Sequence, residues 1–349
     1  MNMIQLGRSG LMVSELCLGS MTWGNRNSAA EGYAQIDTAL DHGVNFIDTA
    51  EMYPVNPVAA ETAGRSEEVI GSWFAKTRRR GDVVIASKIT GAGQPAVRNG
   101  APITKASLRT ALEGSLRRLQ TEVIDLYQLH WPNRGSYHFR QLWEYDPTRE
   151  QDTAAILDHM AEVLETLQSF VNEGKILHFG LSNESAWGMA NWLRIAAEAG
   201  GPPAQSIQNE YSLLCRTFDG DLAELCAREG VTLLAFSPLA AGILSGKYQG
   251  DVTPKGSRRE GNPNLSGRLA SHRVFDAVAA YHDVARAHGL DPCQMALAFV
   301  RSRPVPTIPI FGAVSAAQLD LALGSAEVTL TPELRAALSA VYRAHPMPY

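Results

Sequence analysis

Three apolar runs of this sequence each end on an ionisable side chain, and these residues are the ones best suited to chemistry. Asp48 closes "NFID", Lys88 closes "VVIASK" and His130 closes "LYQLH", and Tyr53 follows Asp48 by five residues. A phenol can give a proton to a carbonyl that becomes an alkoxide, and a nearby ammonium favours the phenolate that results. A carboxylate would keep a buried lysine charged, and an imidazole would orient the carbonyl oxygen by a hydrogen bond. Together the four side chains predict carbonyl chemistry with proton transfer.

Each of these residues also has an explanation without catalysis. Asp48 can cap a turn, Lys88 can be solvated at a strand edge, and His130 can be an ordinary packed histidine. Tyr53, which precedes a proline, can anchor a loop. Because the same polar ending recurs on three successive apolar runs, a shared site explains it better than coincidence. In such a site we expect Lys88 to lower the pKa of Tyr53 from its usual value of about 10 towards the operating pH.

Short apolar runs alternate with longer amphipathic patterns along the whole chain, which indicates an α/β fold. The runs contain few polar positions, as expected of parallel strands covered on both faces. The strands are predicted at residues 14–20, 45–50, 82–88, 123–130, 175–183, 204–211, 231–240 and 306–312. The helices are predicted at residues 31–43, 66–80, 104–120, 154–174, 186–199, 219–229, 273–288 and 292–302, with a last helical stretch after the eighth strand.

Eight strand-and-helix units predict a closed (β/α)8 TIM barrel rather than two doubly wound halves, because no linker-like change of composition divides the chain. A β-hairpin around residues 4–13 is expected to open the chain and cap the barrel. Residues 1–349 are expected to form a single domain.

The barrel would bring the reactive residues together, since functional groups lie at the carboxyl ends of its strands. The three strand-end residues and Tyr53 are therefore expected to meet at that face. Two long loops, at about 131–153 and 241–271, follow strands of the barrel and are expected to contact the substrate and the cofactor.

Composition narrows the class of protein further. The 349 residues are 45% hydrophobic and have a formal net charge of −5, so no basic surface predicts nucleic acid or an anionic membrane as a partner. There is no apolar run of about 18 residues and no charged-then-apolar leader, so a cytoplasmic protein without a membrane segment is expected. The four cysteines are far apart and form no C-x-x-C, which suits reduced thiols better than disulfides or structural zinc.

Several motifs resemble those of a known enzyme family. The segments "DTAEMYP", "ASKI" and "DLYQLHWP" are similar, in order and spacing, to the catalytic segments of aldo-keto reductases. The segments "LGSMTWG", "GLSNESAWG", "SIQNEYSLL", "FSPLAAGILSGKY", "DPCQMALAFV" and "PMPY" resemble the Tas-type bacterial subgroup of that family. The resemblance covers essentially the whole chain. It implies NADPH-dependent reduction of aldehydes or ketones on a (β/α)8 barrel, with Tyr53, Asp48, Lys88 and His130 as the catalytic residues.

The same resemblance implies a cofactor site. In it the amides of Asn183 and Gln208 would bind the nicotinamide carboxamide, and Phe236 would stack on the ring where a tyrosine is more typical. Lys247 and Arg258 would hold the pyrophosphate as fixed cations. The implied cofactor residues are Ser20, Met21, Asp48, Ser182, Asn183, Gln208, Phe236, Ser237, Leu239, Ala241, Lys247, Arg258, Gly312 and Gln318.

The sequence departs from the family pattern after the eighth strand. Many relatives have a lysine or arginine there for the 2′-phosphate and a Glu-Asn pair for the adenine, but residues 314–315 are Val-Ser and residues 321–322 are Leu-Ala. Loss of a charge-assisted contact costs about 1.5–3 kcal/mol. NADPH is therefore the implied cofactor, with NADH as an alternative, and Arg301 or Arg303 is a candidate to compensate.

Two other functions fit parts of the sequence. Because some aldo-keto reductases bind channels and turn over slowly, the chain could be a nucleotide-binding, redox-sensing regulatory subunit with little turnover. A metal-dependent or phosphate-handling barrel is the other alternative. However, histidines such as His138, His159 and His178 form no i, i+4 pair, and "AGILSGKY" lacks the first glycine and the Ser/Thr of a phosphate loop. No metal site is predicted, and no G-x-G-x-x-G follows a strand.

Aromatic residues near the strand ends are candidates to line a substrate pocket. Trp23, Trp131 and the aromatic stretch at 136–145 can line a pocket for an aromatic or apolar carbonyl compound, or they can pack beneath a long loop. The expected partner is a small carbonyl substrate, and the sequence defines neither its identity nor the oligomeric state.

Overall fold

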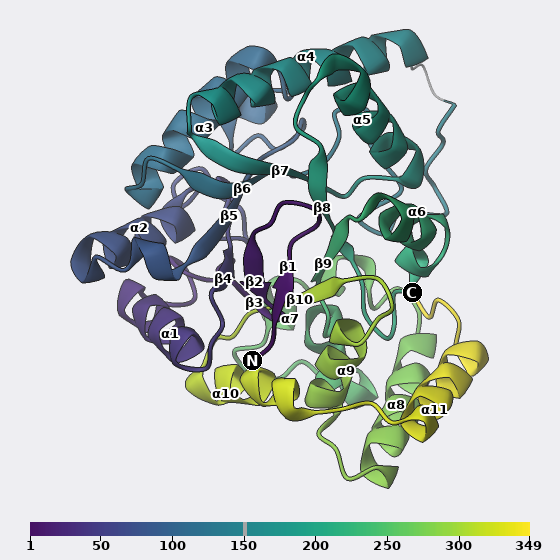
Figure 1. The fold of residues 1–349 in the computed structure, drawn as a ribbon. Helices are drawn as coiled ribbons and strands as arrows, with labels where there is room; N and C mark the ends of the chain where they lie inside the picture. Colours follow the sequence, from purple (N-terminus) through teal and green to yellow (C-terminus); the bar gives the residue numbers. More distant parts are fainter. Residues whose placement is uncertain (149–151) are drawn as a thin grey trace.

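The fold is a closed barrel of eight parallel strands surrounded by helices (Figure 1), in a computed structural model that describes residues 1–148 and 152–349. The strands pair in chain order, and β10 closes the barrel by pairing with β3. The predicted (β/α)8 barrel is therefore confirmed. The barrel strands are β3 (Cys17–Gly19), β4 (Phe46–Asp48), β5 (Val84–Ile89), β6 (Ile124–Leu129), β7 (Ile176–Ser182), β8 (Ala204–Glu210), β9 (Thr232–Phe236) and β10 (Thr307–Phe311).

An antiparallel hairpin of β1 (Met3–Gln5) and β2 (Met12–Ser14) lies across one end of the barrel (Figure 1). The amide of Gly7 donates to the Oγ1 atom of Thr232, the first residue of β9, so this is the amino end of the strands. Side chains from the hairpin fill the inner barrel core, which contains Leu6, Val13, Cys17, Phe46, Val84, Ala86, Leu126, Leu234, Ile308 and Ile310. The hairpin thus closes the amino end and leaves the carboxyl end for chemistry.

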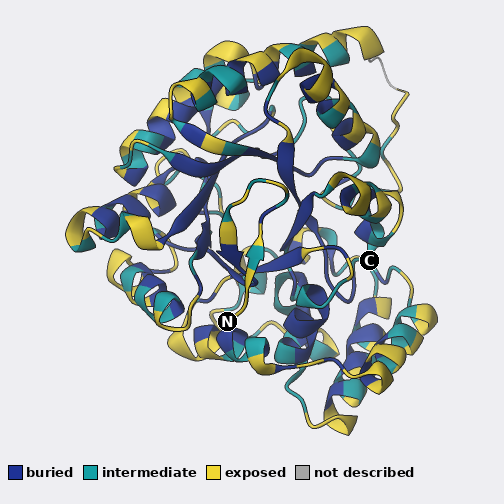
Figure 2. Cartoon of the chain, viewed as in Figure 1, coloured by how far each residue is buried: buried dark blue, intermediate teal, exposed yellow. Residues whose placement is uncertain are grey.

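The helices cover the outside of the barrel, and their buried sides face the strands (Figure 2). Each of the eight helices predicted with bounds is present within three residues of those bounds. The helices are α1 (Ala29–Asp41), α2 (Arg65–Thr77), α3 (Lys105–Leu119), α4 (Thr153–Asn172), α5 (Ala186–Ala199), α6 (Asp221–Glu229), α7 (Arg258–Gly261), α8 (Arg273–Ala287), α9 (Pro292–Arg301), α10 (Ala316–Gly324) and α11 (Pro332–Ala344).

Side-chain caps set where several loops at the carboxyl end of the barrel stop and helices begin. Ser28, Thr104, Ser185 and Ser315 immediately precede α1, α3, α5 and α10, and each accepts a hydrogen bond from a backbone N–H in the first turn. Such a cap satisfies a donor that the helix leaves unpaired and stabilises it by about 1 kcal/mol. The caps therefore fix the lengths of the loops that surround the barrel mouth.

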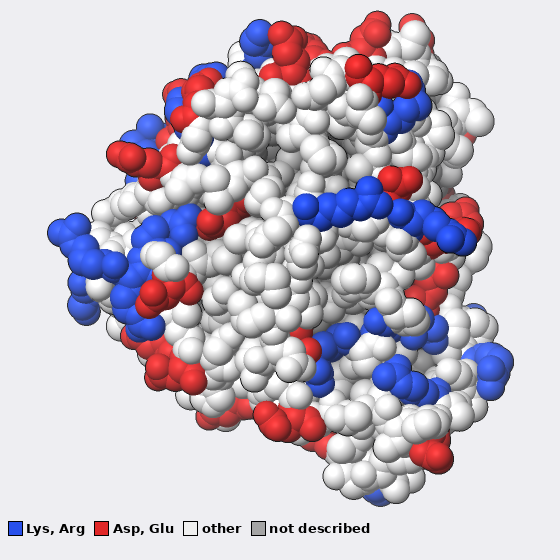
Figure 3. Space-filling model, in the orientation of Figure 1, with Lys and Arg blue, Asp and Glu red and all other residues white. Residues whose placement is uncertain are grey.

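Acidic and basic side chains lie mostly around the edge of the face that carries the hairpin, and much of its middle is uncharged (Figure 3). Within residues 1–148 and 152–349, no helix has both the length and the apolar character needed to cross a membrane. The same residues contain no group of three or more histidine, cysteine or acidic side chains placed to bind a metal ion.

Candidate active site

The four reactive residues predicted from the sequence come together at the carboxyl end of the barrel. Asp48 is the last residue of β4, Lys88 lies near the end of β5, and His130 directly follows β6. The Nζ atom of Lys88 is 2.7 Å from Oδ2 of Asp48 and 3.4 Å from the hydroxyl of Tyr53. The rings of Tyr53 and His130 meet edge to face, with centroids 5.9 Å apart. Neighbouring parallel strands thus place a phenol, an ammonium, a carboxylate and an imidazole in one cluster.

The ion pair at the centre of this cluster is removed from water. The side chains of Lys88 and Asp48 are 0% and 3% exposed. Lys88 also donates to the carbonyl oxygen of Thr49 at 2.8 Å, and Oδ1 of Asp48 accepts from Nε2 of Gln208 at 2.8 Å. Burial lowers the pKa of Lys88, but the charge of Asp48 and the contact with Tyr53 raise it more, so the net shift is upward. The lysine therefore stays charged at neutral pH.

The pKa of Tyr53 differs from the sequence-based expectation. Burial raises this pKa more than the Lys88 ammonium lowers it, and the Asp48 carboxylate adds to the rise, so the net direction is upward. The expectation that Lys88 lowers the pKa below its usual value was wrong, because the lysine charge is shared with a carboxylate and the site is dry. Tyr53 is accordingly protonated at neutral pH and can act as a proton donor.

The imidazole of His130 is neutral in this environment. Burial, followed by the positive charge of Lys88, holds the pKa of His130 well below its usual range. Its Nδ1 atom is buried without a hydrogen-bond partner among the described residues. A neutral imidazole has one N–H donor and one acceptor, so it can donate a hydrogen bond to an oxygen atom while it remains uncharged.

Amide and hydroxyl groups at the ends of β7 and β8 extend the cluster along the carboxyl end of the barrel. Nδ2 of Asn183 donates to the carbonyl oxygen of His130 at 2.9 Å, and Oγ of Ser182 donates to the carbonyl oxygen of Gln208 at 2.8 Å. Oδ1 of Asn183 is buried and has no partner within the described chain. An unpaired buried acceptor costs about 1–3 kcal/mol. This oxygen therefore fits an amide N–H of a bound molecule, such as the carboxamide of a nicotinamide ring.

The loop after β9 has backbone suited to binding anions. Ser237, Ala240, Ala241 and Gly242 all have positive φ values, of 52°, 48°, 58° and 90°. Successive backbone amides in such turns form concave sites for phosphate oxygens. The half-buried side chain of Phe236 ends β9 immediately before this loop. Leu239 of the same loop is partly buried against the main hydrophobic core.

A cluster of cations lies next to this loop. Burial lowers the pKa of both Lys247 and Arg258, and nearby guanidinium groups, that of Arg26 among them, lower both further. Arg258 contacts the Sδ atom of Met21 at 3.9 Å, and in the described residues neither Lys247 nor Arg258 forms an ion pair with a carboxylate. Positive charges left without carboxylates fit the phosphates of a dinucleotide.

Arg26 was not predicted from the sequence, because it is far along the chain from the other cations. Its Nη2 atom donates to the carbonyl oxygen of Gly256, 230 residues away, and this contact holds the loop after β3 against the loop after β9. No motif in the sequence around Arg26 indicates the contact, which only the closed barrel creates.

The remaining cofactor candidates have structural roles in this region. Oγ of Ser20 donates to the carbonyl oxygen of Asp48 at 2.9 Å, which joins the ends of β3 and β4. Gln318 accepts from the amide of Val314 at 3.0 Å, and Gly312 is exposed at the end of β10. These residues surround the barrel mouth.

Arg301 and Arg303 do not supply the missing base after the eighth strand. Arg301 forms an ion pair with Glu15 at 3.0 Å, and Arg303 forms one with Asp219 at 3.2 Å. Both guanidinium groups therefore already have a carboxylate partner. The suggested compensation by either residue is wrong.

The two tryptophans suggested for a substrate pocket have different positions. Trp23 is 0% exposed and donates from its indole nitrogen to Oε1 of Gln35 at 3.0 Å, so it belongs to the core beneath α1 and does not line a pocket. Trp131 lies at the mouth, with its ring centroid 5.0 Å from that of His130 and 5.9 Å from that of Phe139. The aromatic side of the site is thus formed by the loop after β6.

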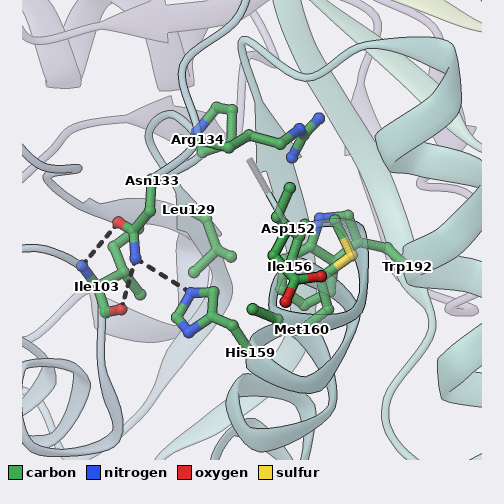
Figure 4. Close-up of a pocket in the computed structure, with 11 residues that line it drawn as sticks. Ile103, Leu129, Asn133, Arg134, Asp152, Ile156, His159, Met160 and Trp192 are labelled. Carbon is green, nitrogen blue, oxygen red and sulfur yellow. Dashed lines mark hydrogen bonds between the residues drawn. The ribbon is translucent and has the colours of Figure 1, made fainter. Parts of the chain in front are cut away.

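A separate cavity of about 390 Å³ lies between α4, α5 and the loop after β6 (Figure 4). Asn133 donates to the carbonyl oxygen of Ile103 at its edge and contacts Nε2 of His159 at 3.1 Å. None of the four clustered reactive residues lines this cavity. Its position outside the strands separates it from the chemistry described above.

The closed barrel, with its cluster of ionisable side chains at the carboxyl ends of the strands, has the architecture of a (β/α)8-barrel oxidoreductase. Residues 15–343 match the model of the Aldo/keto reductase family, and the chain belongs to this family. It is accordingly an NAD(P)H-dependent oxidoreductase that acts on small carbonyl compounds.

Similarity to individual proteins extends over nearly the full length. The chain is 41% identical to Protein tas of Escherichia coli (strain K12), over 99% of this chain and 98% of that protein. It is 31% identical to the uncharacterized oxidoreductase YrpG of Bacillus subtilis (strain 168), over 97% and 94% of the two chains. It is also 30% identical to a probable voltage-gated potassium channel subunit beta of Oryza sativa subsp. japonica, over 98% and 96%.

Proposed function

We propose that the protein reduces aldehydes or ketones to alcohols with NADPH, and that Tyr53 is the general acid. The observation that carries the proposal is the position of the Lys88 ammonium, buried between the Asp48 carboxylate at 2.7 Å and the Tyr53 hydroxyl at 3.4 Å. A bound nicotinamide nucleotide would supply a hydride to the carbonyl carbon. The protein residues would orient the carbonyl group and provide the proton.

The proton step follows from the electrostatics of the cluster. Tyr53 holds its proton at neutral pH because its pKa lies above the usual value. When Tyr53 gives this proton to the substrate oxygen, the phenolate that forms is adjacent to the charged Lys88, which stabilises it. Neutral His130 would donate a hydrogen bond to the same oxygen while negative charge develops there.

The preference for NADPH is proposed from the cation cluster. Arg26, Lys247 and Arg258 would hold the phosphates, including the 2′-phosphate for which residues 314–315 offer no base. The amides of Asn183 and Gln208 would hold the carboxamide, and the ring of Phe236 would stack on the nicotinamide. All these groups belong to residues 1–349, which we propose as a single catalytic domain.

The test is to follow the absorbance of NADPH, and separately of NADH, with a panel of aldehydes, ketones and quinones. We expect turnover with NADPH, its loss in Tyr53→Phe, and unchanged nucleotide binding in that variant by fluorescence titration. Tyr33→Phe is the matched control, because the Tyr33 hydroxyl bonds to Ser72 at 2.6 Å on the outer helices. Full activity of Tyr53→Phe would refute the assignment.

A nucleotide-binding subunit with little turnover is a second candidate. The similarity to the two proteins named as probable potassium channel beta subunits, at 30% and 28% identity, favours it. Tight NADPH binding without oxidation by any member of the carbonyl panel would support this function over the enzymatic one.

A further inference from the structure

A buried ion pair lies directly behind the turn that carries Tyr53. The carboxylate of Glu51 accepts hydrogen bonds from Nη1 of Arg98 and from the backbone amide of Thr90. The side chains of Glu51 and Arg98 are only 5% and 15% exposed. Nη2 of Arg98 also donates to the carbonyl oxygen of Thr90 at 2.6 Å. The Glu51 carboxylate, the Arg98 guanidinium and the backbone of Thr90 therefore each bond to the other two.

This ion pair joins the Tyr53 turn to the strand end that holds Lys88. The backbone amide of Glu51 donates to the carbonyl oxygen of Lys88 at 3.2 Å, while its side chain binds Thr90, two residues further along. Glu51 therefore holds the chain on both sides of Ile89. Because Tyr53 follows Glu51 by two residues, its ring is carried by the segment that these contacts fix.

The loop that supplies Arg98 is itself held against the mouth. A Cβ atom at Gly91 would lie 2.3 Å from the ring of Trp131, so only glycine allows this close approach. The indole nitrogen of Trp131 donates to the carbonyl oxygen of Ala92 at 3.0 Å. Arg98 has a positive φ of 45°, a conformation that the contacts to Glu51 and Thr90 help to maintain.

We infer that Glu51, held by Arg98, is a positioning residue that sets the distance between the Tyr53 hydroxyl and the Lys88 ammonium; this inference rests on the proposed function. The distance of 3.4 Å is at the long end of hydrogen bonding, so a small rotation of the turn breaks the contact. Glu51 acts through geometry, because its carboxylate bonds to Arg98 and to the amide of Thr90 and makes no hydrogen bond to the Tyr53 hydroxyl or the Lys88 ammonium.

A second ion pair, between Glu67 and Arg118 outside the same strand β5, provides a matched control. Glu67 of α2 is 0% exposed, accepts from Oγ of Ser87 at 2.5 Å and from Nε of Arg118 at 2.7 Å. It thus joins β5 to the helices outside the barrel, and its carboxylate makes no hydrogen bond to the turn at 49–53. Loss of either carboxylate leaves a buried arginine without its partner, so both variants should be destabilised.

The experiment compares Glu51→Ala, Glu51→Gln and Glu67→Ala with the unmodified protein. We expect Glu51→Ala to lower kcat for aldehyde reduction by about tenfold to a hundredfold, the effect of misplacing a reacting group by a fraction of an ångström to about 1 Å. Its Kd for NADPH should stay within about twofold, since binding groups are untouched. Glu51→Gln should recover most of kcat, because its amide oxygen can still accept from Thr90.

The pH dependence separates positioning from simple loss of stability. With Tyr53 further from Lys88, the phenolate is less stabilised and the pKa of Tyr53 rises. The high-pH limb of the plot of kcat against pH, where kcat falls as Tyr53 loses its proton, should therefore move to higher pH in Glu51→Ala. Glu67→Ala should lose thermal stability and keep both kcat and the position of that limb. If Glu51→Ala does not fold, Arg98→Gln removes the same ion pair from the less buried side and should move the limb in the same direction.

Two results would overturn the inference. One is a Glu51→Ala or Arg98→Gln protein whose kcat and pH limb match those of the unmodified protein. The other is a Glu67→Ala protein with the same kcat loss and limb shift. Failure of the proposed function is distinct, because it appears as full activity in Tyr53→Phe.

Discussion

Replacing Lys88 by methionine should leave a buried negative charge and destabilise the whole barrel. The Lys88–Asp48 pair is 2.7 Å long, and its side chains are 0% and 3% exposed, so solvent cannot compensate Asp48 after the change. Nε2 of Gln208 would remain as a hydrogen-bond donor to Oδ1 of Asp48, at 2.8 Å. Removing one partner of a buried pair costs about 3–5 kcal/mol. We therefore expect the free energy of unfolding of Lys88→Met to fall by this amount.

The double variant Lys88→Met/Asp48→Asn isolates the charge as the cause. With both charges removed, no buried carboxylate lacks a cation, and well-packed neutral replacements of buried ion pairs are often neutral in stability. We expect the double variant to recover most of the lost free energy while remaining inactive, because Tyr53 has no ammonium beside it.

Urea unfolding followed by circular dichroism, at neutral pH, measures all three proteins on the same scale. A single variant that loses less than about 1 kcal/mol would show that water reaches the pair, as it does in surface ion pairs. A double variant no more stable than the single one would show that the loss comes from packing around the lysine stem. Either result would refute the reasoning from the buried charge.

Three further predictions follow from the site and its surroundings. Tyr53→Phe should lower kcat by about 100-fold to 10,000-fold, the usual contribution of a general acid, with nucleotide affinity unchanged in a fluorescence titration. Arg26→Leu should raise KM for NADPH by about tenfold to a hundredfold and leave KM for NADH nearly unchanged; equal effects on both would place Arg26 away from the 2′-phosphate. Burial lowers the pKa of His130 and His138 in the folded protein, so below about pH 6.5 the unfolded chain binds more protons and stability falls as pH falls. A melting temperature at pH 5.5 equal to that at pH 7.5 would contradict the buried, neutral state of these histidines.

The sequence predicted the parts of this protein that depend on repeating patterns. Eight apolar runs and the helices between them define the barrel, and the barrel rule brings Asp48, Lys88 and His130 to one face. These inferences held because strand ends meet at a fixed place whatever the details of packing. The predicted helix bounds were close because caps and apolar periodicity are local signals.

The properties that the sequence did not predict depend on opposing electrostatic effects or on contacts between residues far apart in the chain. The direction of the pKa shift of Tyr53 is set by burial against the charges of Lys88 and Asp48, and burial cannot be measured from residue types. Trp23 looks like a mouth residue from its place in the chain, but its indole nitrogen bonds to Gln35 within the core. Arg26 is held near Lys247 and Arg258 by a contact with Gly256, 230 residues away.

The hairpin packs Leu6 and Val13 against the inner core at the amino ends of the strands, whereas the clustered polar side chains lie at the carboxyl ends. Apolar packing at the hairpin end is thus separate from the loops at the mouth, although the buried Lys88–Asp48 pair at the mouth also contributes to stability. We therefore expect substitutions beneath the hairpin to affect stability more than substrate selectivity. Loops at the mouth can then differ in sequence while the apolar packing beneath the hairpin is kept.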